Sequence, residues 1–259
     1  MANKVSDKAK TVAAAPWLRI CVTGGIACGK SLVGAYLEAR GVAVIDADAV
    51  CHGLMRAGTP VFQGIVDAFG REILGSDGGI DRAVLGRRVF GDAAALGVLN
   101  ALLHPAAQSA IEEWVLARQA EARLRQGFGG QARLQPVAAI SDPKSAVRNK
   151  KSEIINSAQG WRGGAVAVIP LLYEAAWEAA WDRVVCVGAP MALQQKRLRA
   201  KGFTEKEAHD RIAAQWPVEE KMKRADYVIF NAGTRVCAQR QTDQVMQHIG
   251  IHVEKSDGR

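Results

Sequence analysis

The sequence predicts an α/β fold, a three-layer sandwich of helices around a parallel sheet. Short continuous apolar runs, typical of strands buried on both faces, occur at residues 18–22, 42–45, 165–169, 184–187 and 226–230. Segments with helical periodicity lie between them, and strands that alternate with helices form parallel sheets through right-handed crossovers. The chain has 259 residues, 49% of them hydrophobic and 23% charged, which suits one or two globular domains.

A glycine-rich motif follows the first apolar run. Residues 24–31 match G-x-x-x-x-G-K-[ST], and a strand, a glycine loop and a helix form the context that a phosphate-binding loop requires. Glycines let backbone N–H groups approach phosphates, Lys30 supplies a mobile cation, and Ser31 offers a hydroxyl to Mg²⁺. The residues expected to bind the nucleotide here are Gly24, Gly25, Ile26, Ala27, Cys28, Gly29, Lys30, Ser31 and Leu32.

The helix predicted over residues 30–40 is followed by the second apolar run, which ends in Asp46-Ala47-Asp48. Open α/β sheets bind their ligands at this edge. A carboxylate there can accept the proton of an attacking hydroxyl and help to organise Mg²⁺. We expect Asp48 to be the base and a metal ligand, with a purely structural cap as the alternative. Alternation along a strand predicts that Asp46 shares its face and orders metal-bound water.

Helical periodicity dominates residues 49–121, with interruptions at Pro60 and at the turn-rich segment 75–79. His104-Pro105 predicts a helix boundary, because the residue before a proline disfavours the helical conformation, and a long helix is expected over residues 106–122. With a helix boundary at His104-Pro105, no apolar stretch approaches the roughly eighteen residues of a membrane span.

The net charge of +8 is concentrated in two segments. Residues 123–163 carry eight Lys or Arg against two acidic residues, and residues 1–16 carry three Lys against one Asp, so the remainder is neutral. Residues 1–16 are expected to be a disordered leader, and residues 123–163 a loop-like insertion. A solvated insertion without a partner is favoured over weak binding of a polyanion.

Five cysteines occur without a C-x-x-C spacing, which argues against a zinc site or a redox motif. The N-terminus has no apolar region of signal-peptide length. We therefore expect reduced thiols and a cytoplasmic protein with no membrane partner. In the second half, helices are predicted over residues 192–201, 204–215 and 239–248.

With these pieces in order, the chain resembles the dephospho-CoA kinase family from about residue 18 to 248, except for residues 123–163. The landmarks are Thr23-Gly24-Gly25-Ile26, Val44-Ile45-Asp46-Ala47-Asp48, Leu102-Leu103-His104-Pro105, Pro170-Leu171-Leu172-Tyr173-Glu174, Gln194-Gln195-Lys196-Arg197, Gln215 with Pro217 and Lys221, and Ala225-Asp226-Tyr227-Val228-Ile229 before Asn231. The phosphate-binding loop alone indicates only a very broad superfamily, whereas the ordered set is far more specific.

The resemblance implies ATP-dependent phosphorylation of the ribose 3′-hydroxyl of dephospho-CoA, which gives coenzyme A and ADP. It also implies a P-loop kinase domain over residues 17–259 with its core at 17–48 and 164–250. The helical region 49–122 would bind the CoA moiety, and a mobile lid would span about residues 192–221.

The same resemblance places Arg197 in the lid, where its charge would stabilise the transition state; a solvated helix face is the alternative. Lys201 stands where the family usually has arginine, which puts the lid's second charge contact in doubt. Asn231 falls where related kinases wrap a loop around adenine. Tyr173-Glu174 has two equally supported interpretations, acceptor binding and a structural role.

Three loop positions depart from the family pattern, since Ala27 and Cys28 replace glycine and serine, and Leu32 replaces threonine. A thiol at a helix N-terminus is expected to have a lowered pKa, so modification of Cys28 would block ATP.

Two other functions stay open from the sequence. The first is a P-loop kinase that acts on another small alcohol, such as a nucleoside or a shikimate-like compound. The second is a nucleotide-dependent nucleic-acid-binding protein, which only the basic insertion supports, because the chain has neither N-K-x-D nor an apolar strand ending in Asp-Glu.

Overall fold

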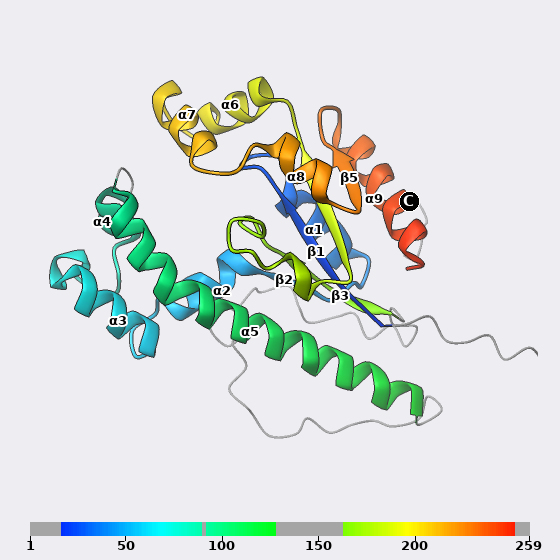
Figure 1. Ribbon diagram of the computed structural model, residues 1–259, viewed down its shortest axis with the longest axis horizontal. Helices are drawn as coiled ribbons and strands as arrows, with labels where there is room; N and C mark the ends of the chain where they lie inside the picture. The colour runs from blue at the N-terminus through cyan, green and yellow to red at the C-terminus, as the bar shows by residue number, and fades with distance from the viewer. Residues whose placement is uncertain (1–16, 90–91, 128–162, 252–259) are drawn as a thin grey trace, which may run out of the picture.

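The computed structural model describes residues 17–89, 92–127 and 163–251 (Figure 1). The predicted leader 1–16 and residues 128–162 of the predicted insertion lie outside the described residues. The described strands are β1 (Leu18–Gly24), β2 (Val44–Asp46), β3 (Gly164–Val168), β4 (Arg183–Gly188) and β5 (Tyr227–Phe230). The described α-helices are α1 (Lys30–Ala39), α2 (Ala47–Leu54), α3 (Pro60–Phe69), α4 (Arg82–Val89), α5 (Ala93–Gly127), α6 (Met191–Arg199), α7 (Glu205–Ala213), α8 (Val218–Arg224) and α9 (Arg235–Ile249). Two short 3₁₀ helices, η1 (Arg71–Ile73) and η3 (Glu178–Ala180), are also present.

The strands form one parallel sheet in the order β2-β3-β1-β4-β5, which confirms the predicted fold class. β1 is central, and β3 lies between it and β2 although it comes much later in the chain. Because all strands are parallel, their carboxyl ends meet at one edge of the sheet. The phosphate-binding loop after β1 and the acidic turn after β2 are therefore brought to the same edge.

Alternating side chains divide the core between the two faces of the sheet. Ile20 and Val22 of β1 pack into one cluster, with buried residues of α1 and α9. Cys21 packs into the other cluster, with Ile111 and Val115 of α5. Figure 1 accordingly shows α5 on the opposite side of the sheet from α1 and α9. Each fully buried aliphatic side chain contributes about 1.5–3 kcal/mol, so both helical layers are strongly attached.

The boundary predicted at His104-Pro105 is wrong, since α5 continues through Pro105 to Gly127. Leu99 and Leu103, before the proline, pack into a core shared with α3 and α4, while Ile111, after it, packs against the sheet. An internal proline removes one helical hydrogen bond, at a cost of about 3 kcal/mol. Burial on both sides of Pro105 offsets that cost. The first residues of the predicted insertion, 123–127, are therefore helical.

The unbroken α5 also corrects the expectation about membrane spans. Its segment Ala93–Leu124 meets the length and composition of a membrane-spanning helix. These criteria alone are weak, because core helices of globular proteins meet them as well. Leu99 and Leu103 of α5 pack in one protein core and Ile111 and Val115 in another, so part of its apolar surface is buried in the protein.

Two smaller differences lie close to the site. The second strand ends at Asp46, and the next residue already begins α2, so Asp48 is on a helix and strand alternation does not relate it to Asp46. The sequence also did not predict α8, a helix of seven residues inside the expected lid segment.

Candidate active site

The phosphate-binding loop depends on backbone conformations that favour glycine. Gly24 and Gly29 have φ angles of 142° and 104°. A side chain at Gly24 would collide with the carbonyl of Val187, and one at Gly29 with the amide of Asn231. Ala27 also has a positive φ, 56°, which costs an L-residue about 1–2 kcal/mol. Ala27, one of the departures from the family pattern, therefore holds a strained position.

Lys30 is turned back onto its own loop. Its Nζ donates to the carbonyl of Gly24 at 3.0 Å and to that of Gly25 at 2.9 Å. Burial lowers the pKa of Lys30 from its usual value of 10.5, and the nearby Lys221 lowers it further. Cys28 and Asp48 have the opposite effect, which is smaller than that of burial. Lys30 is thus a half-buried cation whose partners are neutral carbonyls, and an anion entering the loop would be a better partner.

The carboxylates after β2 have different roles. Oδ1 of Asp46 accepts from the N–H groups of Asp48 and Ala49 and caps α2. Asp48 lies in the first turn of that helix and is exposed, yet desolvation by the surrounding protein, followed by repulsion from Asp46, raises its pKa above the usual 3.8. Lys30 and His52 oppose this increase. The mutual effect of Lys30 and Asp48 places their charges near each other, and a carboxylate with a raised pKa is a stronger base.

Two polar side chains that sequence reasoning missed, Arg82 and His52, lie on the helical side of Asp48. A guanidinium nitrogen of Arg82 on α4 lies 3.1 Å from Nε2 of His52 on α2, with the guanidinium as the donor. Both side chains are exposed, and His52 is near enough to lower the pKa of Asp48. Neither belongs to a recognisable sequence motif, because α2 and α4 come together only in the fold.

Arg197 of α6 is hydrogen-bonded to the backbone of the phosphate-binding loop. Its guanidinium donates to the carbonyls of Ala27 at 3.0 Å and Cys28 at 3.3 Å, and to that of Asn231 at 2.9 Å. The buried Asn231 side chain donates to the Cys28 carbonyl at 2.8 Å. Arg197 and Asn231 therefore both hold the loop, and the Asn231 amide has a contact that its position after β5 did not predict. Lys201, beyond the end of α6, is exposed.

The lowered pKa expected for Cys28 is wrong, because its thiol is fully buried and burial raises its pKa above the usual 9.0. The nearby cations Lys30 and Arg197 have a smaller, lowering effect. Desolvation outweighs the favourable charges, so Cys28 is held as a neutral thiol.

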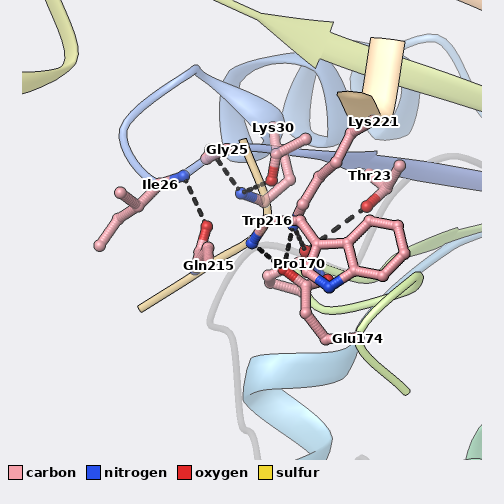
Figure 2. A network of polar contacts seen from close by, with 10 residues as sticks. Thr23, Gly25, Ile26, Lys30, Pro170, Glu174, Gln215, Trp216 and Lys221 are labelled. Atoms are coloured by element: carbon pink, nitrogen blue, oxygen red, sulfur yellow. Dashed lines mark hydrogen bonds and ion pairs between the residues drawn. The ribbon is translucent and has the colours of Figure 1, made fainter. Parts of the chain in front are cut away.

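A polar network joins the segment between α7 and α8 to the loop (Figure 2). Oε1 of Gln215 accepts from the Ile26 N–H at 2.9 Å. Oε1 of Glu174 accepts from the Trp216 N–H at 2.9 Å and lies 2.6 Å from Nζ of Lys221. The Lys221 side chain is fully buried and also donates to the Pro170 carbonyl at 3.0 Å.

Aromatic contacts reinforce this network. The Tyr173 ring stacks on Trp216 with centroids 6.2 Å apart, and the Arg224 guanidinium lies 4.9 Å from the Trp216 ring. Tyr173 is buried, and Glu174 is committed to Lys221 and Trp216. Of the two interpretations of Tyr173-Glu174, these contacts favour the structural role.

The donor set near the loop fits Mg²⁺. The described residues contain no group of three or more His, Cys, Asp or Glu side chains able to hold a metal by themselves. Mg²⁺ needs only one or two protein oxygens when phosphates and water supply the rest. The exposed Ser31 hydroxyl and the Asp48 carboxylate are oxygens of the required kind.

Comparisons with known proteins agree on one family. The family model for dephospho-CoA kinase matches residues 18–124 and 115–236. A dephospho-CoA kinase from Geobacillus kaustophilus is 39% identical over 225 residues, which cover 86% of this chain and 92% of the relative. Another, from Carboxydothermus hydrogenoformans, is 37% identical over 229 residues, which cover 88% and 92%.

A solved structure has the same overall arrangement. The crystal structure of TT1252 from Thermus thermophilus matches with a TM-score of 0.63 and 27% sequence identity. The match covers 90% of this chain and 97% of that chain.

Proposed function

Because this chain belongs to the dephospho-CoA kinase family, we propose how its own residues carry out the phosphorylation of dephospho-CoA. The reaction transfers the γ-phosphoryl group of ATP to the ribose 3′-hydroxyl and gives coenzyme A and ADP. The family that the sequence resembles is thus confirmed. The observation that carries the assignment of roles is that Lys30, after β1, and Asp48, after β2, lie at the same edge of the parallel sheet.

Asp48 is the general base in this proposal. Its carboxylate accepts the proton of the 3′-hydroxyl while the hydroxyl oxygen bonds to the γ-phosphorus and the bond to the leaving ADP oxygen breaks. The raised pKa of Asp48 makes that proton transfer more favourable. A base of this kind contributes roughly 10²–10⁴-fold to the rate.

Lys30 and Arg197 stabilise the phosphate charge. Lys30 exchanges the carbonyls of Gly24 and Gly25 for phosphate oxygens, which are stronger acceptors for an ammonium group. Arg197 brings a second positive charge to the loop through the carbonyls of Ala27 and Cys28. Positioning and neutralisation of charge supply most of the catalysis in phosphoryl transfer.

Ser31 and Asp48 would hold Mg²⁺. The bound ion supplies Lewis-acid neutralisation of phosphate charge and a template that orients the phosphates. The loop residues 24–32 bind the phosphates mainly through backbone N–H groups, except that of Ile26, which Gln215 holds, and residues around Asn231 face the adenine.

The remaining assignments concern whole segments. The helical region 49–122 binds the acceptor, and His52 and Arg82 suit its phosphate charges because they lie on the Asp48 side of that region. Residues 192–221 form the lid. A cytoplasmic location belongs to the same proposal, since all five cysteines are free thiols, as expected in a reducing compartment.

The test is an acceptor panel. The purified protein is given Mg²⁺ and ATP with dephospho-CoA, adenosine, shikimate or no acceptor, and products are identified by mass spectrometry. We expect ADP formation that depends on dephospho-CoA and a product heavier by one phosphate. Turnover only with another alcohol would support another small-molecule P-loop kinase and overturn the substrate.

A further inference from the structure

The arm formed by α6, α7 and the return segment 214–217 contacts the phosphate-binding loop at two places, one on α6 and one after α7. At the α6 end, Arg197 donates to the carbonyls of Ala27 and Cys28. After α7, Gln215 accepts from the N–H of Ile26. Three consecutive loop residues, 26–28, are thus hydrogen-bonded to two points on one arm.

The return segment of the arm, residues 214–217, is held in turn by a hydrogen bond from Trp216 to Glu174. Figure 2 shows the Trp216 N–H and the Lys221 ammonium meeting at Glu174, beside the Pro170 carbonyl. Glu174, in the turn after β3, is therefore bonded to the segment that contains Gln215, and Gln215 accepts from the Ile26 N–H of the loop. We call the contacts of Glu174 with Trp216 and Lys221 the anchor.

The Lys221–Glu174 pair is poorly arranged for stability alone. The Lys221 side chain is fully buried and that of Glu174 is 16% exposed, yet Oε2 of Glu174 is buried without a hydrogen-bond partner. Desolvation of a buried ion pair commonly cancels its attraction, and apolar residues of similar size are often as stable. Such a pair is better explained by the fixed position that it gives to the atoms it holds.

We propose that Lys221 and Glu174 are positioning residues that hold the return segment so that Gln215 stays on the Ile26 amide. Through this path the pair sets the conformation of loop residues 26–28 and the resting place of the arm. Its effect is on the alignment of phosphates for transfer, because small misplacements of reacting groups lower turnover strongly. The inference rests on the proposed function for its kinetic consequence, whereas its structural consequence is independent of the substrate.

The test compares a buried pair with an exposed pair on the same helix. The variant Lys221→Met/Glu174→Leu removes both buried charges and the shared acceptor. Lys223→Met/Glu220→Leu is the matched control, because Lys223 and Glu220 form an exposed ion pair at 2.7 Å on α8. For each protein we would measure the unfolding midpoint, ATP affinity by calorimetry, kcat with dephospho-CoA, and the hydrogen-exchange rate of the Ile26 amide.

The buried-pair variant is expected to unfold at nearly the wild-type temperature and to keep ATP affinity within about threefold. Its kcat falls by about tenfold or more, and the Ile26 amide exchanges faster by a similar factor. The control changes none of these. Wild-type kcat in the variant, with an unchanged Ile26 exchange rate, would overturn the inference.

Two further measurements keep the outcomes separate. If the buried-pair variant does not fold, Gln215→Leu decides, since it removes only the acceptor of the Ile26 N–H: unchanged kcat and exchange would overturn the path. If wild-type protein does not phosphorylate dephospho-CoA, the proposed function fails. The exchange rate of Ile26 then still tests the anchor, and no increase in the variants would overturn it.

Discussion

Two lysine–carboxylate pairs near the phosphate-binding loop have the same residue types but different arrangements. Lys221 and Glu174 are bonded at 2.6 Å. Lys30 and Asp48 are not ion-paired in the described structure, although each shifts the pKa of the other. Lys30 bonds instead to neutral carbonyls. The comparison teaches that a charge already satisfied by the protein positions its neighbours, whereas a charge left with weak partners is available to a ligand.

Substitution of the two carboxylates is expected to separate these roles most strongly. Asp48→Asn keeps the shape but removes the base, so kcat should fall by roughly 10²–10⁴-fold with little change in the unfolding temperature. Glu174→Gln keeps an acceptor for the Trp216 N–H and should lose far less turnover. Steady-state kinetics with dephospho-CoA measure both, and an Asp48→Asn enzyme with near-normal kcat would reject Asp48 as the base.

The pH profile sharpens the same comparison. The pKa of Asp48 is raised above 3.8, so turnover should decline as pH falls through that higher value. The pKa of Lys30 is lowered below 10.5, so phosphate binding should weaken as pH rises through that lower value. A bell-shaped profile of kcat/KM is expected. The residual activity of Asp48→Asn should lack the acidic limb, and an unchanged acidic limb would assign it to another group.

Thiol labelling tests whether burial outweighs the cations beside the loop. Cys237 is exposed, and hydrogen bonds from Thr234 lower the pKa of its thiol. Cys28 is buried with a raised pKa. Because each pKa unit changes the thiolate fraction about tenfold, maleimide should label Cys237 at least tenfold faster than Cys28 in the native protein. Mass spectrometry identifies the labelled sites. Faster labelling of Cys28 than of Cys237 would contradict the inference that burial keeps the Cys28 thiol unreactive.

The smallest effect is expected from relief of strain in the loop. Ala27→Gly removes the penalty of a positive φ but adds freedom to the unfolded chain, so it should stabilise the fold by about 0.5–1 kcal/mol in urea unfolding. Ala176→Gly is a matched control, because Ala176 also has a positive φ, 48°, outside the loop. Both should gain stability with turnover unchanged; a loss in Ala27→Gly would show that the strain is compensated in the loop.

How much the sequence predicts depends on whether the signal is local. The phosphate-binding loop and the five strands could be read from short runs of residues, because glycine conformations and buried strands act locally. Pro105 gave a local signal for a helix end that distant packing on both sides overrides. The Cys28 pKa depends on burial by remote segments, and the anchor of Lys221 on Glu174 joins residues that are far apart in sequence. Those features required the fold.

ATP affinity of Lys30→Met and of Lys221→Met/Glu174→Leu, measured by calorimetry beside wild type, tests the central distinction most directly. The account predicts that Lys30→Met weakens ATP binding by about tenfold or more, while the buried-pair variant stays within about threefold of wild type. Equal losses in the two variants, or a larger loss in the buried-pair variant, would contradict the distinction between the ligand-binding and the positioning lysine.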